Sequence, residues 1–274
     1  MGLRINQNIA AMNAYRNLSV TSGQMEKSLE KLSSGFRINR AADDAAGLAI
    51  SEGLRSQIGG LKTAVRNAQD GVSVVQTAEG ALTEVHSILQ RVRDLSVQAA
   101  NDGSNNTTSL SAIQSEITQL GQALTDIASR TNFNGKNLLD GSSASLTFQV
   151  GANSTDTATV TLTSITAVAT AVAAIDVTAA GGGTAGITAV DTQINTVSTA
   201  RAQLGASQNY LEHTVNSLNV AVENLSASES RIRDTDMAQE MVQFTRSQIL
   251  SQAGTAMLAQ ANSAPQGVLQ LLRG

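Results

Sequence analysis

The sequence is notable first for what it lacks: cysteine and tryptophan are absent, and only four Phe and two Tyr occur in 274 residues. Without cysteine the chain has no disulfide framework, thiolate zinc site or cysteine nucleophile. Aromatic side chains normally supply much of a globular core, so a compact enzyme fold fits poorly. The single proline leaves helices free to run without interruption.

Long apolar runs and concentrated positive charge are also missing. No stretch approaches the roughly 18 uninterrupted apolar residues of a membrane span, so we expect no membrane insertion. The net charge is -4, and residues 137–200 contain no Lys or Arg, which argues against a nucleic-acid surface. Residues 1–10 lack the apolar segment of a cleaved secretory signal. These features alone predict a cytosolic protein.

A heptad repeat dominates the second half of the chain. From Ile187 onward, apolar residues recur at spacings of three and four, which is typical of a helix in a coiled coil. One phase of the repeat is apolar at every position: Val190, Val197, Leu204, Leu211, Leu218, Leu225 and Ile232. The other phase is interrupted by Arg201, Gln208 and Glu229. One long helix is predicted.

Two more helices are predicted in the first half. One apolar pattern runs from Leu54 to Val92, and another from Leu110 to Ile127. The polar stretch 101–109 between them is short, which favours antiparallel neighbours. The predicted fold is mainly α, a long antiparallel helical bundle or coiled coil of three helices.

The middle of the chain, residues 141–186, changes to Thr, Ala, Ser and Gly. Segments 146–150 and 158–162 alternate with period two and predict a small β-hairpin. The run Gly181–Gly186 satisfies the G-x-G-x-x-G pattern of dinucleotide sites, but no βαβ context or downstream acid supports that function. We interpret it as a flexible turn before the long helix.

Both ends of the chain carry apolar helical faces with few charges. Residues 247–272 contain no charged side chain. Such faces require a partner helix or a neighbouring copy. The predicted assembly residues are Ile5, Ile9, Met12, Met25, Leu29, Leu32, Met241, Phe244, Met257 and Leu258.

Residues suited to catalysis or metal binding do not form convincing sites. His86 and His213 are the only histidines, and neither belongs to a zinc motif. Asp43 and Asp44 are adjacent and do not face each other as an acid–base pair must. We expect no cofactor, no metal and no enzymatic activity. Ion pairing at a hinge or between subunits is a better role for the terminal charges, with solvated surface charge as the alternative: Arg37, Arg40, Asp43, Asp44, Arg231, Arg233 and Asp234.

Several long motifs occur in a fixed order at both ends. They include Leu32–Asn39, Ala41–Gly47, Leu89–Leu95, Asn132–Gly135, Ser230–Met237 and Ala253–Asn262. Together these segments resemble the bacterial flagellins over residues 1–140 and 187–274. The resemblance implies a structural subunit that self-assembles into the helical flagellar filament for swimming motility.

The resemblance also implies that different segments of the chain have different places in the filament. Residues 1–44 and 234–274 would form the inner filament tube and be disordered in the free monomer. Residues 45–140 and 187–233 would form the outer tube, with 141–186 as a short surface-facing variable segment. Export would run through the flagellar secretion channel without a cleaved signal peptide, which places the protein outside the cell and replaces the cytosolic interpretation.

Partners follow from the same resemblance. They are other copies of the chain, the filament cap, hook-associated junction proteins, an export chaperone on the C-terminal segment, and the vertebrate Toll-like receptor for flagellin. The positions expected to contact the receptor or adjacent subunits are Gln90, Arg91, Leu95 and Glu116. The alternative function is a hook–filament junction protein with flagellin-like ends.

Overall fold

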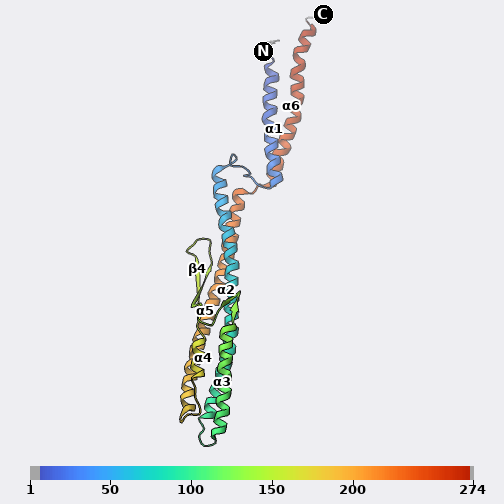
Figure 1. Cartoon of the computed structure of the whole chain (residues 1–274). Helices are drawn as coiled ribbons and strands as arrows, with labels where there is room; N and C mark the ends of the chain where they lie inside the picture. Colours follow the sequence, from blue (N-terminus) through green and yellow to red (C-terminus); the bar gives the residue numbers. More distant parts are fainter. Residues whose placement is uncertain (1–6, 272–274) are drawn as a thin grey trace. The chain divides into compact units, whose positions relative to one another are not determined.

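The computed structural model describes the backbone of residues 7–271 (Figure 1). The described part is mainly helical, as predicted. The helices are α1 (Ile9–Ser34), α2 (Ala45–Ala99), α3 (Thr107–Arg130), α4 (Thr166–Ala173), α5 (Gly182–Arg233) and α6 (Met237–Leu271). The strands are β1 (Asn132–Phe133), β2 (Lys136–Asn137), β3 (Ser145–Gln149) and β4 (Thr157–Thr161).

The chain divides into two compact units. One unit combines the two ends, Met1–Ser56 and Asn224–Gly274, and is called here the terminal unit. The other comprises Gln57–Glu223 and is called the central unit. The boundary between the units falls after Ser56, within α2, and after Glu223, within α5, so both helices contribute to both units.

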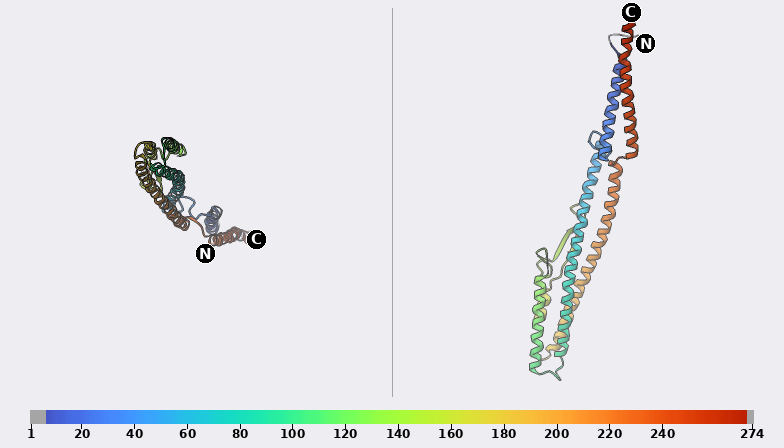
Figure 2. Two further views of the ribbon diagram at one scale, coloured as in Figure 1. Left: turned by 90° about the horizontal axis from the view of Figure 1, so that it is seen from below. Right: turned by 90° about the vertical axis from the view of Figure 1, so that its right-hand side faces the viewer.

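The central unit is built on an antiparallel pair of helices, α2 and α5 (Figure 2). Two ion pairs show the register: Arg93 Nε lies 2.7 Å from Asp191 Oδ1, and Arg201 Nη2 lies 2.7 Å from Glu79 Oε1. The seam predicted on α5 is confirmed here, since it places four buried residues in the core: Val190, Val197, Leu204 and Leu211. Arg201, which interrupts the other phase, is therefore held by Glu79 at the edge of this core.

Helix α3 completes the predicted three-helix core. Ile113, Ile117 and Leu124 are buried in one apolar cluster with α2 and α5. The N-terminus of α3 is a capping box, in which Asn106 Oδ1 accepts from Ser109 N and Ser109 Oγ accepts from Asn106 N. Capping fixes where the polar connection ends and the helix begins.

The predicted β-hairpin is confirmed, shifted by one residue. β3 and β4 pair in antiparallel register, with Leu146 opposite Val160 and Thr147 opposite Thr159. Residues Ala158 and Val160 on β4 are buried, whereas Thr157, Thr159 and Thr161 are exposed. The alternation of side chains thus attaches one face of the hairpin to the core and leaves a face of hydroxyls in solvent.

The middle segment also contains a helix that the periodicity did not predict. α4 buries Val168, Ala169 and Val172 and packs on α3 near Gly121. The Gln114 side chain then secures the chain beyond α4, because its Nε2 donates to Ile175 O and its Oε1 accepts from Val177 N, both at 2.8 Å. Residues 141–186 are therefore more than a surface hairpin.

The interpretation of residues 181–186 as a flexible turn is wrong. α5 already begins at Gly182, and Gly183 and Gly186 are buried. A Cβ placed on Gly183 would lie 2.5 Å from the backbone nitrogen of Ala100. The glycines therefore allow the start of α5 to approach the end of α2 more closely than any side chain permits. Within residues 181–186, only Gly181, with φ of 73°, has a left-handed turn conformation.

Candidate assembly surface

The terminal unit is built on an antiparallel pair of helices, α1 and α6, which lie side by side (Figure 2). Three contacts show the register. Asn8 Nδ2 donates to Ala261 O at 2.7 Å, Leu18 packs beside Gly254, and Lys31 Nζ lies 3.6 Å from Glu240 Oε2. Asn8 also caps α1, since its side chain accepts from Ala11 N.

Half-buried and buried positions recur on both helices at spacings of three and four. On α1 they are Ala11, Ala14, Leu18, Thr21, Met25, Ser28 and Leu32. On α6 they are Glu240, Phe244, Ser247, Ser251, Gly254, Leu258 and Ala261. This spacing is that of a two-helix seam. The seam is made largely of small and polar side chains, and Ser28 and Ser247 are its most deeply buried members.

Most of the large apolar side chains of these two helices lie outside the seam. We call them the outer apolar residues: Ile9, Met12, Tyr15, Val20, Leu29, Met237, Met241, Val242, Ile249, Leu250 and Met257, all exposed. A helix pair that is stable by itself places such residues between its helices. Here only the smaller share of them lies between the helices, so most of the large apolar side chains of the pair remain available to other partners.

The predicted assembly residues divide between the seam and the outer surface. Ile9, Met12, Leu29, Met241 and Met257 are exposed. A second group is half-buried along the seam: Met25, Leu32, Phe244 and Leu258. Ile5 lies outside the described residues. The sequence therefore identified the two helices that pair, but it could not separate residues that face the partner helix from residues that face outward. Their role in assembly stays a prediction.

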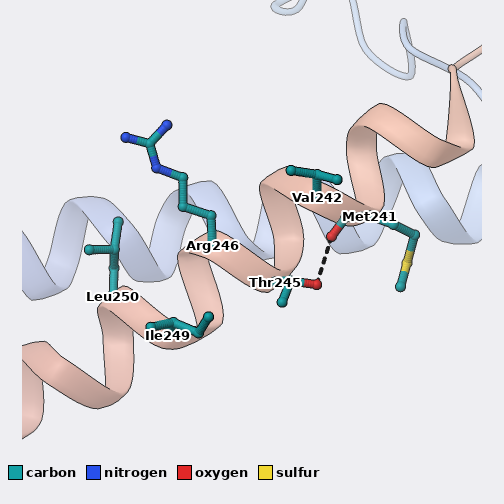
Figure 3. A pocket seen from close by; sticks show the side chains of 6 residues that line it. All are labelled: Met241, Val242, Thr245, Arg246, Ile249 and Leu250. Carbon is teal, nitrogen blue, oxygen red and sulfur yellow. Dashed lines mark hydrogen bonds between the residues drawn. The ribbon is translucent and has the colours of Figure 1, made fainter.

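One part of the outer surface forms an open groove along α6 (Figure 3). It is lined by Met241, Val242, Thr245, Arg246, Ile249 and Leu250. Thr245 Oγ1 donates to the Met241 carbonyl at 2.8 Å, which satisfies the hydroxyl within the helix. Arg246 is the only charged side chain in this lining, so the groove presents mainly methyl groups and one thioether.

A short pairing of backbone joins the two connections of the terminal unit, residues 35–37 and 233–235. Arg37 N donates to Arg233 O at 2.7 Å, and Thr235 N donates to Gly35 O at 2.9 Å. The guanidinium of Arg233 lies 4.9 Å from the centre of the Phe36 ring, a cation–π contact. Gly35, with φ of 75°, supplies the left-handed conformation that ends α1 before this pairing.

The arginines predicted at the hinge make different contacts within the chain. Arg40 Nε lies 2.9 Å from Glu30 Oε1, and Arg233 Nη1 lies 2.8 Å from Glu52 Oε1. The other two donate to uncharged groups: Arg37 to Ile232 O and Arg231 to Ser228 Oγ. Sequence reasoning missed Glu30 and Glu52, because a glutamate within a helix carries no local sign of a partner distant in sequence.

The predicted aspartates act on local backbone and hydroxyl groups. Asp44 Oδ1 accepts from Gly47 N at 2.9 Å and so caps α2. Asp43 Oδ2 accepts from the backbone nitrogens of Arg40 and Asn39, and the Arg40 bond is the main cause that lowers the pKa of Asp43. Asp234 Oδ2 accepts from Ser230 Oγ at 2.6 Å. Ion pairing of these carboxylates with a second subunit stays a prediction.

A second candidate surface lies where α2 meets α3. Arg91 Nη2 lies 2.7 Å from Glu116 Oε1, and both side chains are accessible to solvent. Gln90 is exposed, and its Nε2 lies 3.0 Å from His86 Nε2. Leu95 differs, because only 2% of it is exposed. The expectation that Leu95 contacts a partner directly is corrected: its spacing from Val92 and Ala99 places it in the core.

The described residues include neither a metal-binding cluster nor a membrane-spanning helix. Among them, no cluster of three or more His, Cys, Asp or Glu is placed to hold a metal ion. In the same part of the chain, no helix has the length and apolarity to cross a membrane. Paired terminal helices with their apolar side chains outside define a class of protein: a structural subunit that is completed by other copies of itself.

Comparison with known proteins specifies this class. The chain belongs to the bacterial flagellin family: residues 5–144 match the bacterial flagellin N-terminal helical region, and residues 187–272 match the C-terminal helical region. The interval between the two matches contains the hairpin β3–β4 and helix α4. The predicted resemblance to flagellins is confirmed.

Individual relatives agree with this assignment. The chain is 54% identical to a flagellin of Halalkalibacterium halodurans over 271 residues, covering 98% of this chain and 99% of the relative. It is 50% identical to a flagellin of Bacillus subtilis over 304 residues, covering 99% of this chain and all of the relative. Among solved structures, that of Bacillus cereus flagellin is 31% identical with a TM-score of 0.50 and covers 56% of this chain and 88% of its own.

Family membership confirms the general function predicted from the sequence. The protein is a non-enzymatic structural subunit of the flagellar filament, and it polymerises for motility. The relatives from Halalkalibacterium halodurans and Bacillus subtilis match it along 99% and 100% of their length and are flagellins. They favour a filament subunit over the alternative of a hook–filament junction protein.

Proposed function

We propose that the subunit polymerises by burying the outer apolar residues of α1 and α6 against neighbouring copies. The observation that carries this proposal is the distribution of side chains in the terminal unit, which buries Ser28 and Ser247 but exposes Val242 and Ile249. Burial of apolar area contributes about 25 cal/mol per Å². Repeated over many copies, such contacts stabilise a helix pair that has little apolar area within its own seam.

The proposal assigns a role to each part of the chain. Residues 1–44 and 234–274 form the inner tube of the filament, and 45–140 with 187–233 form the outer tube. Residues 141–186 form the short variable segment on the surface of the filament, with one side packed on the core of their own subunit. The absence of cysteine and the scarcity of bulky aromatic residues suit export of an unfolded chain through the flagellar secretion channel. A chaperone covers the apolar C-terminal segment until assembly beneath the cap.

Charge placed on the outer surface tests the assembly proposal. Val242 and Ile249 are 68% and 60% exposed, so glutamate at either position is compatible with the folded monomer. In a filament the same glutamate becomes a buried, unpaired charge that costs on the order of 3–5 kcal/mol. We expect Val242→Glu and Ile249→Glu to raise the critical concentration for seeded polymerisation at least about 100-fold, measured by sedimentation of filaments.

A matched variant controls for the added charge itself. Gln203→Glu introduces the same side chain at an exposed position of α5 in the central unit. Circular dichroism of the monomers verifies that all three variants keep their helical content. Filaments that elongate normally from both α6 variants would show that the outer residues are not buried on assembly, and the proposal would be wrong.

We also propose that the free subunit is recognised by the vertebrate Toll-like receptor for flagellin through the Arg91–Glu116 surface. The proposal is supported by the ion pair of these residues, whose side chains are 55% and 43% exposed, and by the exposed Gln90 beside them. A planar guanidinium held by a carboxylate still has donors free for a partner. Leu95 contributes only by supporting α2 from the core.

Arg91→Ala separates recognition from folding. An exposed ion pair contributes about 0–1 kcal/mol to stability, so the variant retains its fold. We expect it to lose receptor signalling in a reporter-cell assay. Arg130→Ala is the matched control, because Arg130 is also an exposed arginine that pairs with a carboxylate, Asp126, at 3.2 Å. Full signalling by Arg91→Ala would contradict the proposal.

A further inference from the structure

The methionines are concentrated on the outer surface of the terminal unit. Four of the five described methionines are exposed: Met12 is 61%, Met237 47%, Met241 49% and Met257 64% exposed. The fifth, Met25, is half-buried in the seam between α1 and α6. Methionine is usually a core residue, so this distribution is the reverse of the usual one.

Two of these methionines lie at the same level of the helix pair. Asn8 bonds to the Ala261 carbonyl, and the helices run antiparallel. Met12 follows Asn8 by one turn, and Met257 precedes Ala261 by one turn. A third, Met241, lines the groove on α6 together with Val242 and Ile249. Figure 3 shows its thioether extending away from the other labelled side chains.

We propose that Met12, Met241 and Met257 are oxidation sites whose conversion to methionine sulfoxide prevents the free subunit from assembling. The oxidant is a peroxide or a hypohalous acid. With hydrogen peroxide, a sulfur lone pair attacks one oxygen, an S–O bond forms and the O–O bond breaks. The thioether loses two electrons, the peroxide gains them, and water leaves with the transferred proton.

The sulfoxides form among the outer apolar residues, which in the proposed function are buried away from water on assembly. A sulfoxide converts a flexible apolar side chain into a polar one with a strong acceptor. That acceptor is hydrated on the free subunit and has to lose its water when a neighbour covers it. Since the chain contains no cysteine, no thiol of its own competes for the oxidant. Sulfoxide formation is reversible by methionine sulfoxide reductases.

The assembled filament, unlike the free subunit, is protected from this oxidation. In a filament the outer apolar residues lie against neighbouring copies, so the oxidant no longer reaches their sulfur atoms. The inference rests on the proposed function for this protection. It makes oxidation a restriction on subunits that await assembly, while finished filament is resistant.

The test compares each protein with its own untreated form. Purified full-length monomer is oxidised with hydrogen peroxide, and peptide mass spectrometry locates the sulfoxides. The critical concentration for seeded polymerisation is measured before and after. We expect oxidation to raise it about tenfold or more for the natural sequence, and treatment with both epimer-specific reductases to restore it.

Leucine variants show which methionines are responsible. A triple variant, Met12→Leu, Met241→Leu and Met257→Leu, should show little change between its oxidised and untreated forms. Met25→Leu is the matched control and should remain as sensitive as the natural sequence. In filaments, peptides containing Met12, Met241 and Met257 should gain sulfoxide more slowly than in monomer.

Three outcomes would overturn the inference: full assembly of monomer that carries all three sulfoxides, equal sensitivity of the triple leucine variant, or equal oxidation of filament and monomer. The glutamate variants of Val242 and Ile249 keep its failure distinct from that of the proposed function. If those variants block assembly and the sulfoxides do not, only the oxidation inference is wrong. If neither blocks assembly, the proposed burial of the outer surface is wrong as well.

Discussion

At the scale of single residues, Gln114 fixes the backbone of one connection in the central unit. Both polar atoms of its side-chain amide form hydrogen bonds: Nε2 donates to Ile175 O, and Oε1 accepts from Val177 N. These are main-chain groups of the segment between α4 and α5, which has no regular secondary structure there to satisfy them. One side chain on α3 therefore replaces the pairing that a strand would supply.

Truncation of this side chain tests its contribution. Gln114→Ala leaves two main-chain groups of a half-buried segment without their partner, and we expect a loss of about 1–3 kcal/mol in the free energy of unfolding. Urea unfolding monitored by circular dichroism gives the value. Gln119→Ala, an exposed position on the same helix, should change stability by less than about 0.5 kcal/mol. Equal effects at the two positions would contradict the role of Gln114.

At the scale of elements, α5 uses glycine in two different ways. Near its start, Gly183 is buried against the backbone at the end of α2, and Gly186 is buried against the side chains of Ser96 and Ile175. Further along, a Cβ added to Gly205 would meet no neighbouring atom within 4 Å. The first two glycines serve packing, whereas the third only increases the flexibility of the unfolded chain and weakens the helix.

Alanine at these positions is expected to have opposite effects on stability. Gly183→Ala introduces a methyl group 2.5 Å from Ala100 N, and overpacking of this kind costs about 1–3 kcal/mol. Gly205→Ala should stabilise the protein by about 0.5–1 kcal/mol, because alanine is the better helix former. Thermal unfolding of the two variants in parallel gives the sign of each change. A stabilising Gly183→Ala would show that the helices separate there without cost.

At the scale of the whole molecule, the two units differ in how they are held together. The central unit has one continuous apolar cluster drawn from α2, α3, α4, α5 and the β3–β4 hairpin. In the terminal unit, by contrast, the seam is rich in alanine, serine and glycine, and the large apolar residues are exposed. Under the proposed assembly, we therefore expect its stability to depend more on neighbouring copies than that of the central unit does.

Limited proteolysis measures this difference directly. A protease cuts where the chain opens locally, so free monomer should lose about 40 residues from each end while the central unit survives. The products are identified by intact mass. Filaments exposed to the same protease should keep their ends, since neighbours cover α1 and α6. Ends that persist in the monomer as long as in the filament would show that the terminal unit is stable without neighbours.

Much of the fold follows from local pattern. Val190, Val197, Leu204 and Leu211 recur every seven residues, and all four are buried as that period predicts. Strands β3 and β4 were predicted to within one residue, because alternation of side chains is also a local property. The two-residue strands β1 and β2 were not predicted. Helix α4 was not predicted. Its eight residues are too few for a helical period to stand out, and all of them are Ala, Val or Thr.

The candidate surfaces were predictable only in part. Arg91 and Glu116 were both identified, and they form an ion pair across two helices. Leu95, four residues from Arg91, belongs to the same sequence motif yet is buried. Glu30 and Glu52 were missed, although they pair with Arg40 and Arg233. A motif records which residues occur together in sequence, and it contains no information on which of them face solvent.

The sequence by itself determined that this protein is helical, that its ends are apolar and short of charge, and that it resembles flagellins. These conclusions depend on composition, periodicity and motif order, which are properties of neighbours along the chain. Only the tertiary structure decided that Met25 faces the partner helix while Met12 and Met257 face outward. The physical reason is that a helical period shows which side chains share a face, whereas the packing of a second helix decides which face is covered.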